Sequence, residues 1–340
     1  MSAVLSAYEA ALATGRAYDL FGRLFLHGLT PALFAVVETI PELAAVASPY
    51  DPDEAAAAFH TLLGMNIFPY QSLFLDDTGL LGGQESDRVR HSYREMGFAV
   101  DERNEPADHL GHELLALSHL CLAEAEAWED GQVDMVARIR RLEIAFLTGH
   151  VWRWLPVFVI ALQRQGPSFY GHLAGLTQEL TLARLPPSPC RGTAPRHGGQ
   201  GVGVAALATA PAAGPSPRER VDRLLADAKT GLAEIAAFLL TPVYSGFYLG
   251  RQDITRLGRA VEVPTGFGER RHMLHTLLQN AATRDRWQDL LAALTGVVDD
   301  FAAGYDRLTS TTAAPLVQPW QERLAATRHL LARMGEATAT

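Results

Sequence analysis

The chain has 340 residues, which exceeds the usual size of a single hydrophobic core and predicts two folded units. Apolar residues make up 48% and charged residues 20%, a composition typical of globular proteins and not of disordered ones. The net charge of -9 repels phosphate backbones, which argues against nucleic acid as the main partner and favours basic peptides.

The sequence predicts neither an export signal nor a membrane anchor. Residues 1–15 lack a basic stretch and have the spacing of an amphipathic helix. The longest apolar run, residues 154–162, is far shorter than the roughly 18 residues that cross a bilayer. Cys121 and Cys190 are too few for a disulfide framework or an iron–sulfur cluster. We therefore expect a cytoplasmic protein with no membrane insertion.

Apolar residues recur at intervals of three and four through most of the chain, which is the spacing of amphipathic helices. Residues 55–63 and 110–122 are also rich in alanine and leucine, which favour helices. Runs of β-branched residues are short and lie within helical patterns, as in residues 157–160. The expected fold class is all-α, without a parallel sheet.

A change of composition predicts the domain boundary. Residues 186–217 contain seven prolines, six glycines and no acidic residue, which predicts a flexible linker. This linker separates a first domain, residues 1–185, from a second helical region, residues 218–340. A glycine pattern at residues 201–206 imitates a dinucleotide-binding fingerprint, but it lies in the linker and no strand precedes it.

The C-terminal extension is expected to be helical as well. The spacing predicts helices at residues 219–240, 252–261, 269–282 and 287–308. The extension holds fifteen basic and fourteen acidic residues, so it is nearly neutral. Five of its arginines suit the phosphate of a pyranopterin or an acidic protein surface, although a solvated helix face has the same pattern: Arg251, Arg256, Arg259, Arg270 and Arg271.

Residues 104–122 combine a helix start with a high density of charge. Asn104 or Glu105 is expected to cap this helix, with Pro106 in its first turn. Asp108 would then place negative charge near the positive end of the helix dipole. Four residues at spacings of four, three and four predict one buried stripe: Leu110, Leu114, Leu117 and Cys121.

Three polar residues of this segment fall on other faces of the predicted helix. His109, His112 and Glu113 are residue types that bind zinc, so a zinc site is the alternative interpretation. Their spacing matches no established zinc motif. We therefore expect hydrogen-bonded or solvated histidines and no bound metal.

The same segment resembles a known family. Six residues are similar to the E-P-x-D-H-x-x-x-E-L signature of the TorD/DmsD/NarJ chaperones: Glu105, Pro106, Asp108, His109, Glu113 and Leu114. Six more resemble the family's F-L-x-x-H-x-x-x-W-x-P-x-F helix: Phe146, Leu147, His150, Trp154, Pro156 and Phe158. By itself, aromatic and leucine spacing of this kind predicts core packing, with Pro156 kinking or ending its helix and so shaping a groove.

Two shorter segments extend the resemblance to about residues 7–185. Residues 169–177 are similar to the family's F-Y-x-x-L-A-x-L-T segment. Pro69, Tyr70 and Ser72 match its P-Y-E-S segment, but Gln71 replaces the usual glutamate and removes one carboxylate. Residues 76–113 hold ten acids and four arginines, so the negative charge is concentrated around these motifs.

The resemblance implies a TorD-like helical bundle that acts as a chaperone and not as an enzyme, with no cofactor of its own. It would bind the twin-arginine leader, or the apo form, of a molybdopterin-containing oxidoreductase and assist cofactor insertion and assembly before export. By motif position the peptide-binding residues would be Asp108 and His109, followed by Pro106, Glu105, Tyr70 and Ser72. The protein itself would be a monomer or a homodimer.

Two other classes of function remain as alternatives. One is a metal- or nucleotide-dependent hydrolase, although the chain has no phosphate-binding loop before its single lysine, Lys229. The other is a scaffold whose extension, tethered by the linker, binds a second protein.

Overall fold

The computed structural model describes residues 6–187 and 214–336, which form two compact units. Of these, the first unit takes residues 6–76, 80–155 and 162–187, and the second takes residues 77–79, 156–161 and 214–336. The predicted linker and its glycine pattern fall almost wholly outside the described residues. In the described ranges the strand-type pairing is one isolated bridge, between Tyr70 and His109, so the all-α fold class is confirmed.

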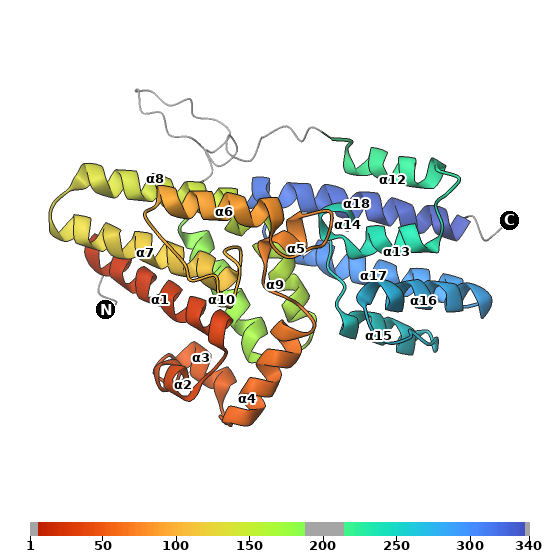
Figure 1. Cartoon of the computed structure of the whole chain (residues 1–340), viewed down its shortest axis with the longest axis horizontal. Coiled ribbons are helices and arrows are strands. Elements are labelled where there is room, and N and C mark those ends of the chain that lie inside the picture. Colours follow the sequence, from red (N-terminus) through yellow and green to blue (C-terminus); the bar gives the residue numbers. More distant parts are fainter. Residues whose placement is uncertain (1–5, 188–213, 337–340) are drawn as a thin grey trace. The chain divides into compact units, whose positions relative to one another are not determined.

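The first unit is built on long helices that lie along one another and are joined by shorter ones (Figure 1). The short helices α2, α3 and α4 each begin with a proline, which suits a first helical position because its missing N–H needs no partner there. Up to residue 187 the elements are α1 (Ala7–His27), α2 (Pro31–Val37), α3 (Pro41–Ala47), α4 (Pro52–Phe59), η1 (His60–Gly64), α5 (Gln71–Leu75), α6 (Gly83–Glu95), α7 (Leu110–Glu129), α8 (Val133–Gly149), η2 (Val151–Arg153), α9 (Leu155–Gln163) and α10 (Phe169–Ala183). Residues 156–161 of α9 belong to the second unit.

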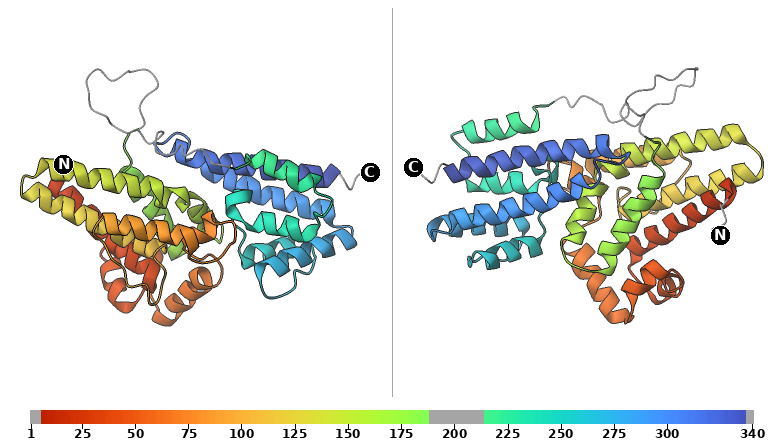
Figure 2. Two further views of the ribbon diagram at one scale, coloured as in Figure 1. Left: turned by 45° about the horizontal axis from the view of Figure 1, so that its top comes forward. Right: turned by 180° about the vertical axis from the view of Figure 1, so that it is seen from behind.

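Helices α1 and α7 lie side by side and form the centre of the first unit (Figures 1 and 2). They approach closely at two glycines. A Cβ on Gly22 would lie 2.8 Å from the Gly111 carbonyl oxygen, and one on Gly111 would lie 2.6 Å from the Gly22 carbonyl oxygen. The predicted stripe on α7 is confirmed, since all four of its side chains are fully buried: Leu110, Leu114, Leu117 and Cys121.

The chain changes direction between α8 and α9. Helix α8 ends at Gly149, the turn η2 follows, and α9 then runs at 47° to the preceding segment. Pro156 is the second residue of α9, where its missing N–H costs no hydrogen bond. The expected break is present, but Pro156 begins the new helix and does not end the old one.

No single helix among the described residues is long and apolar enough to cross a bilayer, although the bent pair Val133–Arg153 and Leu155–Gln163 passes that test together.

The second unit contains α12 (Pro217–Ala226), α13 (Leu232–Leu240), α14 (Pro242–Ser245), α15 (Arg251–Ala260), α16 (Arg270–Thr283), α17 (Trp287–Asp306) and α18 (Ala314–Glu336). Helices α17 and α18 are the longest and pack against each other, with α12 along α18 and α13 along α16 (Figure 2). The expected helices at residues 252–261, 269–282 and 287–308 are confirmed as α15, α16 and α17.

The expectation of one helix over residues 219–240 is wrong, because two helices occupy that range. Asp227 accepts a 2.9 Å hydrogen bond from the Lys229 amide, and the Thr230 hydroxyl donates to the Leu224 carbonyl oxygen at 2.6 Å. These side chains end α12, and Glu234 then caps the start of α13 at Gly231. The apolar spacing continues across the turn, so the sequence pattern does not indicate the break between the two helices.

Helix α18 is absent from the sequence-based expectations. Pro315 lies in its first turn and Pro319 lies inside it, and prolines are typical helix breakers. The helix continues past both, with Val317, Trp320 and Leu324 buried against the rest of the unit.

Candidate functional site

The start of α7 is organised by His109 and not by the residues expected to cap it. Nδ1 of His109 accepts a 3.0 Å hydrogen bond from the Gly111 amide, so His109 is the N-cap. Asn104, Glu105 and Pro106 lie in the irregular segment before the helix, and the expectation that they form its cap and first turn is wrong. Burial lowers the pKa of His109 to about 3, so its ring is neutral at pH 7 and available as an acceptor.

Asp108 fastens the signature segment to the upstream segment that carries Tyr70 and Ser72. Its carboxylate Oδ2 accepts a 2.8 Å hydrogen bond from the Ser72 amide, and its carbonyl oxygen accepts a 2.9 Å bond from the Gln71 amide. The side chain is fully buried, and Oδ1 has no hydrogen-bond partner within residues 6–187 and 214–336. The structure therefore brings Asp108 and Ser72 together, as residues that hold two loops in place.

Tyr70 and Glu105 form a second, half-buried connection between the same two segments. The Tyr70 hydroxyl donates a hydrogen bond to Oε2 of Glu105. The Tyr70 ring also meets His109 edge-on, with 5.0 Å between ring centroids. Burial and the neighbouring Glu105 carboxylate raise the pKa of Tyr70, which keeps its hydroxyl a donor. Of the predicted residues, Tyr70, Glu105 and Pro106 are the ones only partly buried.

The second motif packs directly against the first. The Trp154 indole donates a 3.2 Å hydrogen bond to Oε2 of Glu113, and the Trp154 ring lies 5.2 Å from that of Phe74. Nε2 of His150 lies 2.8 Å from the Ser92 hydroxyl. The core packing expected for this motif is confirmed, because Phe146, Leu147, Trp154 and Phe158 are buried.

Gln71, which departs from the family pattern, lies beside a carboxylate supplied by another helix. Its Nε2 donates a 2.7 Å hydrogen bond to Glu85 on α6, and both side chains are buried. Arg153 donates to the same Glu85 oxygen at 2.9 Å. Glu85 thus places a carboxylate near the position where the family motif has a glutamate, but this carboxylate forms an ion pair with Arg153.

A hollow of about 660 Å³ lies beside the signature, between α1, α7 and the loop that precedes α7. Its carboxylates are Asp19, Asp101 and Glu105, and we call it the acidic groove. Its other lining residues are largely apolar or histidine: Leu26, His27, Phe98, Ala99, Val100, Asn104, His112, Leu115, Ser118, His119 and Leu122. The groove thus combines negative charge with apolar surface, the two properties that a basic and apolar peptide needs.

The three carboxylates of the acidic groove differ in their partners. Asp19 pairs with the exposed Arg23 at 2.9 Å, and Asp101 pairs with the exposed Arg103. Glu105 makes no ion pair with any residue in the described ranges, and its partner is the Tyr70 hydroxyl. Glu105 is therefore the carboxylate most available to an incoming cation.

Sequence reasoning missed part of this groove. Asp19 and Leu26 come from α1, far from the signature in sequence, and no local pattern marks them. Leu122 also lines the groove and lies against α1, where a Cβ on Gly15 would be 3.1 Å from Leu122 Cδ2. Conversely, the charge of residues 76–113 overstates the acidity of the groove, because Glu85, Asp108 and Glu113 are buried.

The residues considered for zinc are hydrogen-bonded within the chain. Nδ1 of His109 is used by Gly111, Nδ1 of His112 lies 3.0 Å from the Pro106 carbonyl oxygen, and Glu113 accepts from Trp154. Across residues 6–187 and 214–336, these three do not bring one ligand atom each within 4.8 Å of one another. Burial, together with the Asp108 charge, raises the pKa of Glu113 well above its usual range.

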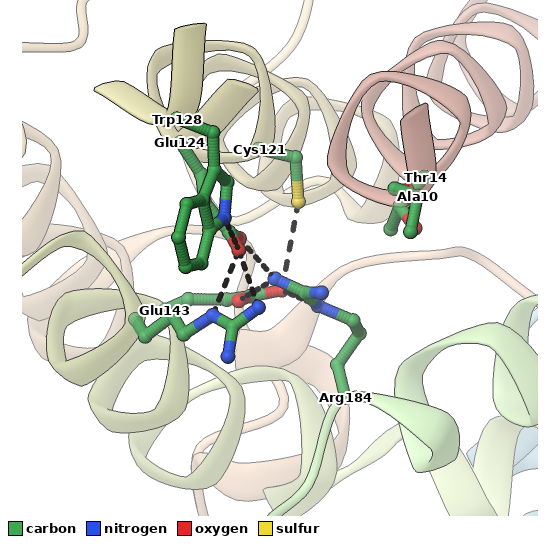
Figure 3. A network of polar contacts seen from close by, with 8 residues as sticks. Ala10, Thr14, Cys121, Glu124, Trp128, Glu143 and Arg184 are labelled. Carbon is green, nitrogen blue, oxygen red and sulfur yellow. Dashed lines mark hydrogen bonds and ion pairs between the residues drawn. The ribbon is translucent and has the colours of Figure 1, made fainter. Parts of the chain in front are cut away.

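One group of possible ligands does converge, deep in the first unit (Figure 3). Cys121, Glu124 and Glu143 meet there, but Arg184 donates to both carboxylates, at 2.5 Å and 2.6 Å. Arg140 adds a second cation at 2.7 Å from Glu124. Burial alone would raise the pKa of Glu124, yet Arg184 and Arg140 hold it below its usual value. The cluster is therefore a buried ion network that already contains its own cations.

Comparison with known proteins agrees with the motifs. A family model described as the nitrate reductase delta subunit matches residues 32–159. The chaperone protein TorD of Vibrio cholerae serotype O1 is 31% identical over 91 residues, which cover 26% of this chain and 40% of that protein. The chaperone protein TorD of Aliivibrio fischeri is 29% identical over 110 residues, which cover 32% of this chain and 50% of that protein.

The chain spans about half the length, or less, of these curated relatives, and no solved structure matches it. The family model ends within α9, before α10, so residues 214–336 of the second unit lie outside it. The match does include the residues that build the acidic groove's loop and the start of α7. Within its first unit the chain is therefore similar to the nitrate reductase delta subunit family and to the TorD chaperones.

Proposed function

We propose that the first unit is a cytoplasmic, non-catalytic chaperone that binds the twin-arginine leader, or the apo form, of a molybdopterin-containing oxidoreductase before export. The observation that carries this proposal is the acidic groove, where the carboxylate of Glu105, which makes no ion pair within the described ranges, stands among apolar side chains next to the signature. A leader of this type has two arginines followed by an apolar stretch, so both halves find complementary surface.

The site residues divide into two roles in this proposal. Glu105 receives a leader arginine through a charge-assisted hydrogen bond, with Tyr70 and Pro106 beside it. Asp108, His109 and Ser72 hold the two loops that present Glu105, because their polar atoms are engaged with backbone amides. Since Asp108 and His109 are buried, their replacement is expected to act on the peptide through the position of these loops.

The test is calorimetric titration of the full chain with a twin-arginine leader peptide, compared with the same peptide carrying glutamines in place of the two arginines. We expect a dissociation constant in the micromolar range, roughly -8 kcal/mol. Glu105→Gln combined with Asp101→Asn should weaken binding by about tenfold, the size of one lost charge-assisted hydrogen bond. The arginine-free peptide should bind wild type and variant equally weakly.

Glu129→Gln is the matched control, because it removes one exposed charge at the far end of α7 without touching the groove. Binding should be unchanged in this variant. If the leader and the apo client both fail to bind wild type, or if the groove variant binds as tightly as wild type, the proposed site is wrong.

A further inference from the structure

The second unit presents one large aromatic side chain to solvent. Phe267 is 95% exposed, more than any other large apolar residue in the described ranges. It stands at the tip of a short segment between α15 and α16, residues 264–268, which we call the Phe267 loop. An aromatic ring kept in water loses the favourable burial that it would gain against a partner.

The base of the Phe267 loop is firmly attached to the unit. The Asn280 side chain donates a 2.9 Å hydrogen bond to the Pro264 carbonyl oxygen, and Val263, just before the loop, is buried. A Cβ on Gly258 would lie only 2.3 Å from Thr265 Cγ2, so α15 and the loop are in close contact. The ring is therefore presented from a fixed base.

The backbone on both sides of the ring has positive φ angles. Gly266 has φ +70° and Gly268 has φ +110°, conformations that favour glycine. Glu262, one turn earlier, also has a positive φ of +57°, which is uncommon for a residue with a side chain. The glycines on either side of Phe267 allow the backbone to take these angles without steric strain.

Phe267 lines a hollow of about 540 Å³ whose lining also includes two arginines. Phe267, Val263 and Met273 supply apolar walls, and Arg259 and Arg284 supply guanidinium groups. Neither arginine has a side-chain partner among the residues that the structure describes. The acid that lines the hollow, Glu262, faces Arg286 at 3.7 Å.

We propose that Phe267, Arg259 and Arg284 form a docking site for a protein segment in which an apolar side chain is flanked by carboxylates. The apolar side chain enters the hollow and packs on Phe267, and the carboxylates pair with the two arginines. This segment has the opposite charge to the one that suits the acidic groove. The inference therefore concerns a second binding surface and does not depend on leader binding.

The hollow favours a protein segment over a lipid surface. A bilayer covers protruding apolar side chains, but it cannot fill a concavity whose walls include Val263 and Met273 behind the ring. A peptide can place an apolar side chain and part of its backbone in the hollow, which brings the neighbouring carboxylates within reach of Arg259 and Arg284.

The test uses fluorescence anisotropy of a labelled synthetic peptide, rich in glutamate with two leucines, titrated with the full chain. Binding should weaken by about tenfold in Phe267→Ser, and by a similar factor in the double variant Arg259→Glu, Arg284→Glu. Raising the salt from about 0.05 M to about 0.5 M should also weaken it, because the contacts are partly ionic. Both sites are exposed, so the variants are expected to stay folded.

Arg251→Glu is the matched control, since Arg251 is exposed on the same helix but does not line the hollow. It should bind the peptide as wild type does. A peptide with serines in place of the leucines should bind about tenfold more weakly than the original. The proposal is overturned if no peptide binds wild type, or if Phe267→Ser binds equally well.

A binding measurement with lipid vesicles tests whether Phe267 contacts a membrane instead of a protein segment. Wild type that binds vesicles of phosphatidylglycerol through Phe267, with no binding of the acidic peptide, would overturn the proposal in favour of a membrane contact. The affinity of the Phe267→Ser variant for the leader peptide should equal that of wild type. The two proposed sites can therefore be tested independently of each other.

Discussion

The indole nitrogen of Trp154 donates a 3.2 Å hydrogen bond to the Glu113 carboxyl group, and both side chains are fully buried. Glu113 belongs to the signature at the start of α7, and Trp154 lies just before α9. Two sequence motifs about forty residues apart are therefore one structural unit in the folded protein.

Replacing Trp154 by Phe should destabilise the first unit. The variant keeps an aromatic ring but leaves the buried Glu113 carboxyl group without its hydrogen-bond donor. A buried polar group that loses its partner costs about 1–3 kcal/mol in the free energy of unfolding, measured by urea titration.

Trp152→Phe provides the comparison for that measurement. Trp152 is equally buried, but its indole nitrogen meets no hydrogen-bond partner among the described residues, so the variant shrinks the ring without breaking a hydrogen bond. Equal losses in the two variants would show that ring volume, and not the bond to Glu113, decides the stability.

The helices and the buried stripe of α7 could be predicted because apolar spacing records burial along one element. The N-cap of α7 could not be predicted in the same way. Several polar residues at 104–109 are suitable N-caps, and contacts with the rest of the fold decide that His109 takes this role. Burial of Asp108 and Glu113 could not be predicted either, because the Ser72 amide and the Trp154 indole that donate hydrogen bonds to them are distant in the sequence. The groove wall from α1 depends on packing between distant segments.

His150 should make stability fall as the pH falls. Burial, reinforced by the neighbouring Arg153, lowers the pKa of His150 to about 4, below the 6.5 expected in the unfolded chain. Between these values the unfolded chain binds a proton that the folded protein does not, so stability is present above pH 6.5 and is lost as the pH falls toward 4.

His150→Gln should remove this part of the pH dependence. Between pH 7 and pH 4 the wild type should lose up to about 3 kcal/mol more than the variant, from urea titrations at each pH. The raised pKa of Glu113 acts in the opposite direction, but it is common to both proteins and cancels in the difference. Parallel pH profiles of wild type and variant would contradict the assignment.

Arg184→Met should unfold the first unit more easily than any exposed change. Arg184 is 16% exposed and pairs with Glu124 and Glu143, whose side chains are 0% and 2% exposed. Without it Glu143 loses its cation, and removing one partner of a buried pair costs about 3–5 kcal/mol.

Arg141→Met, an exposed change on α8 with no ion pair in the described ranges, should cost little. The double variant Arg184→Met, Glu143→Gln should recover part of the loss, because the uncompensated charge is gone. Additive losses in urea titration would mean that the two residues are not coupled.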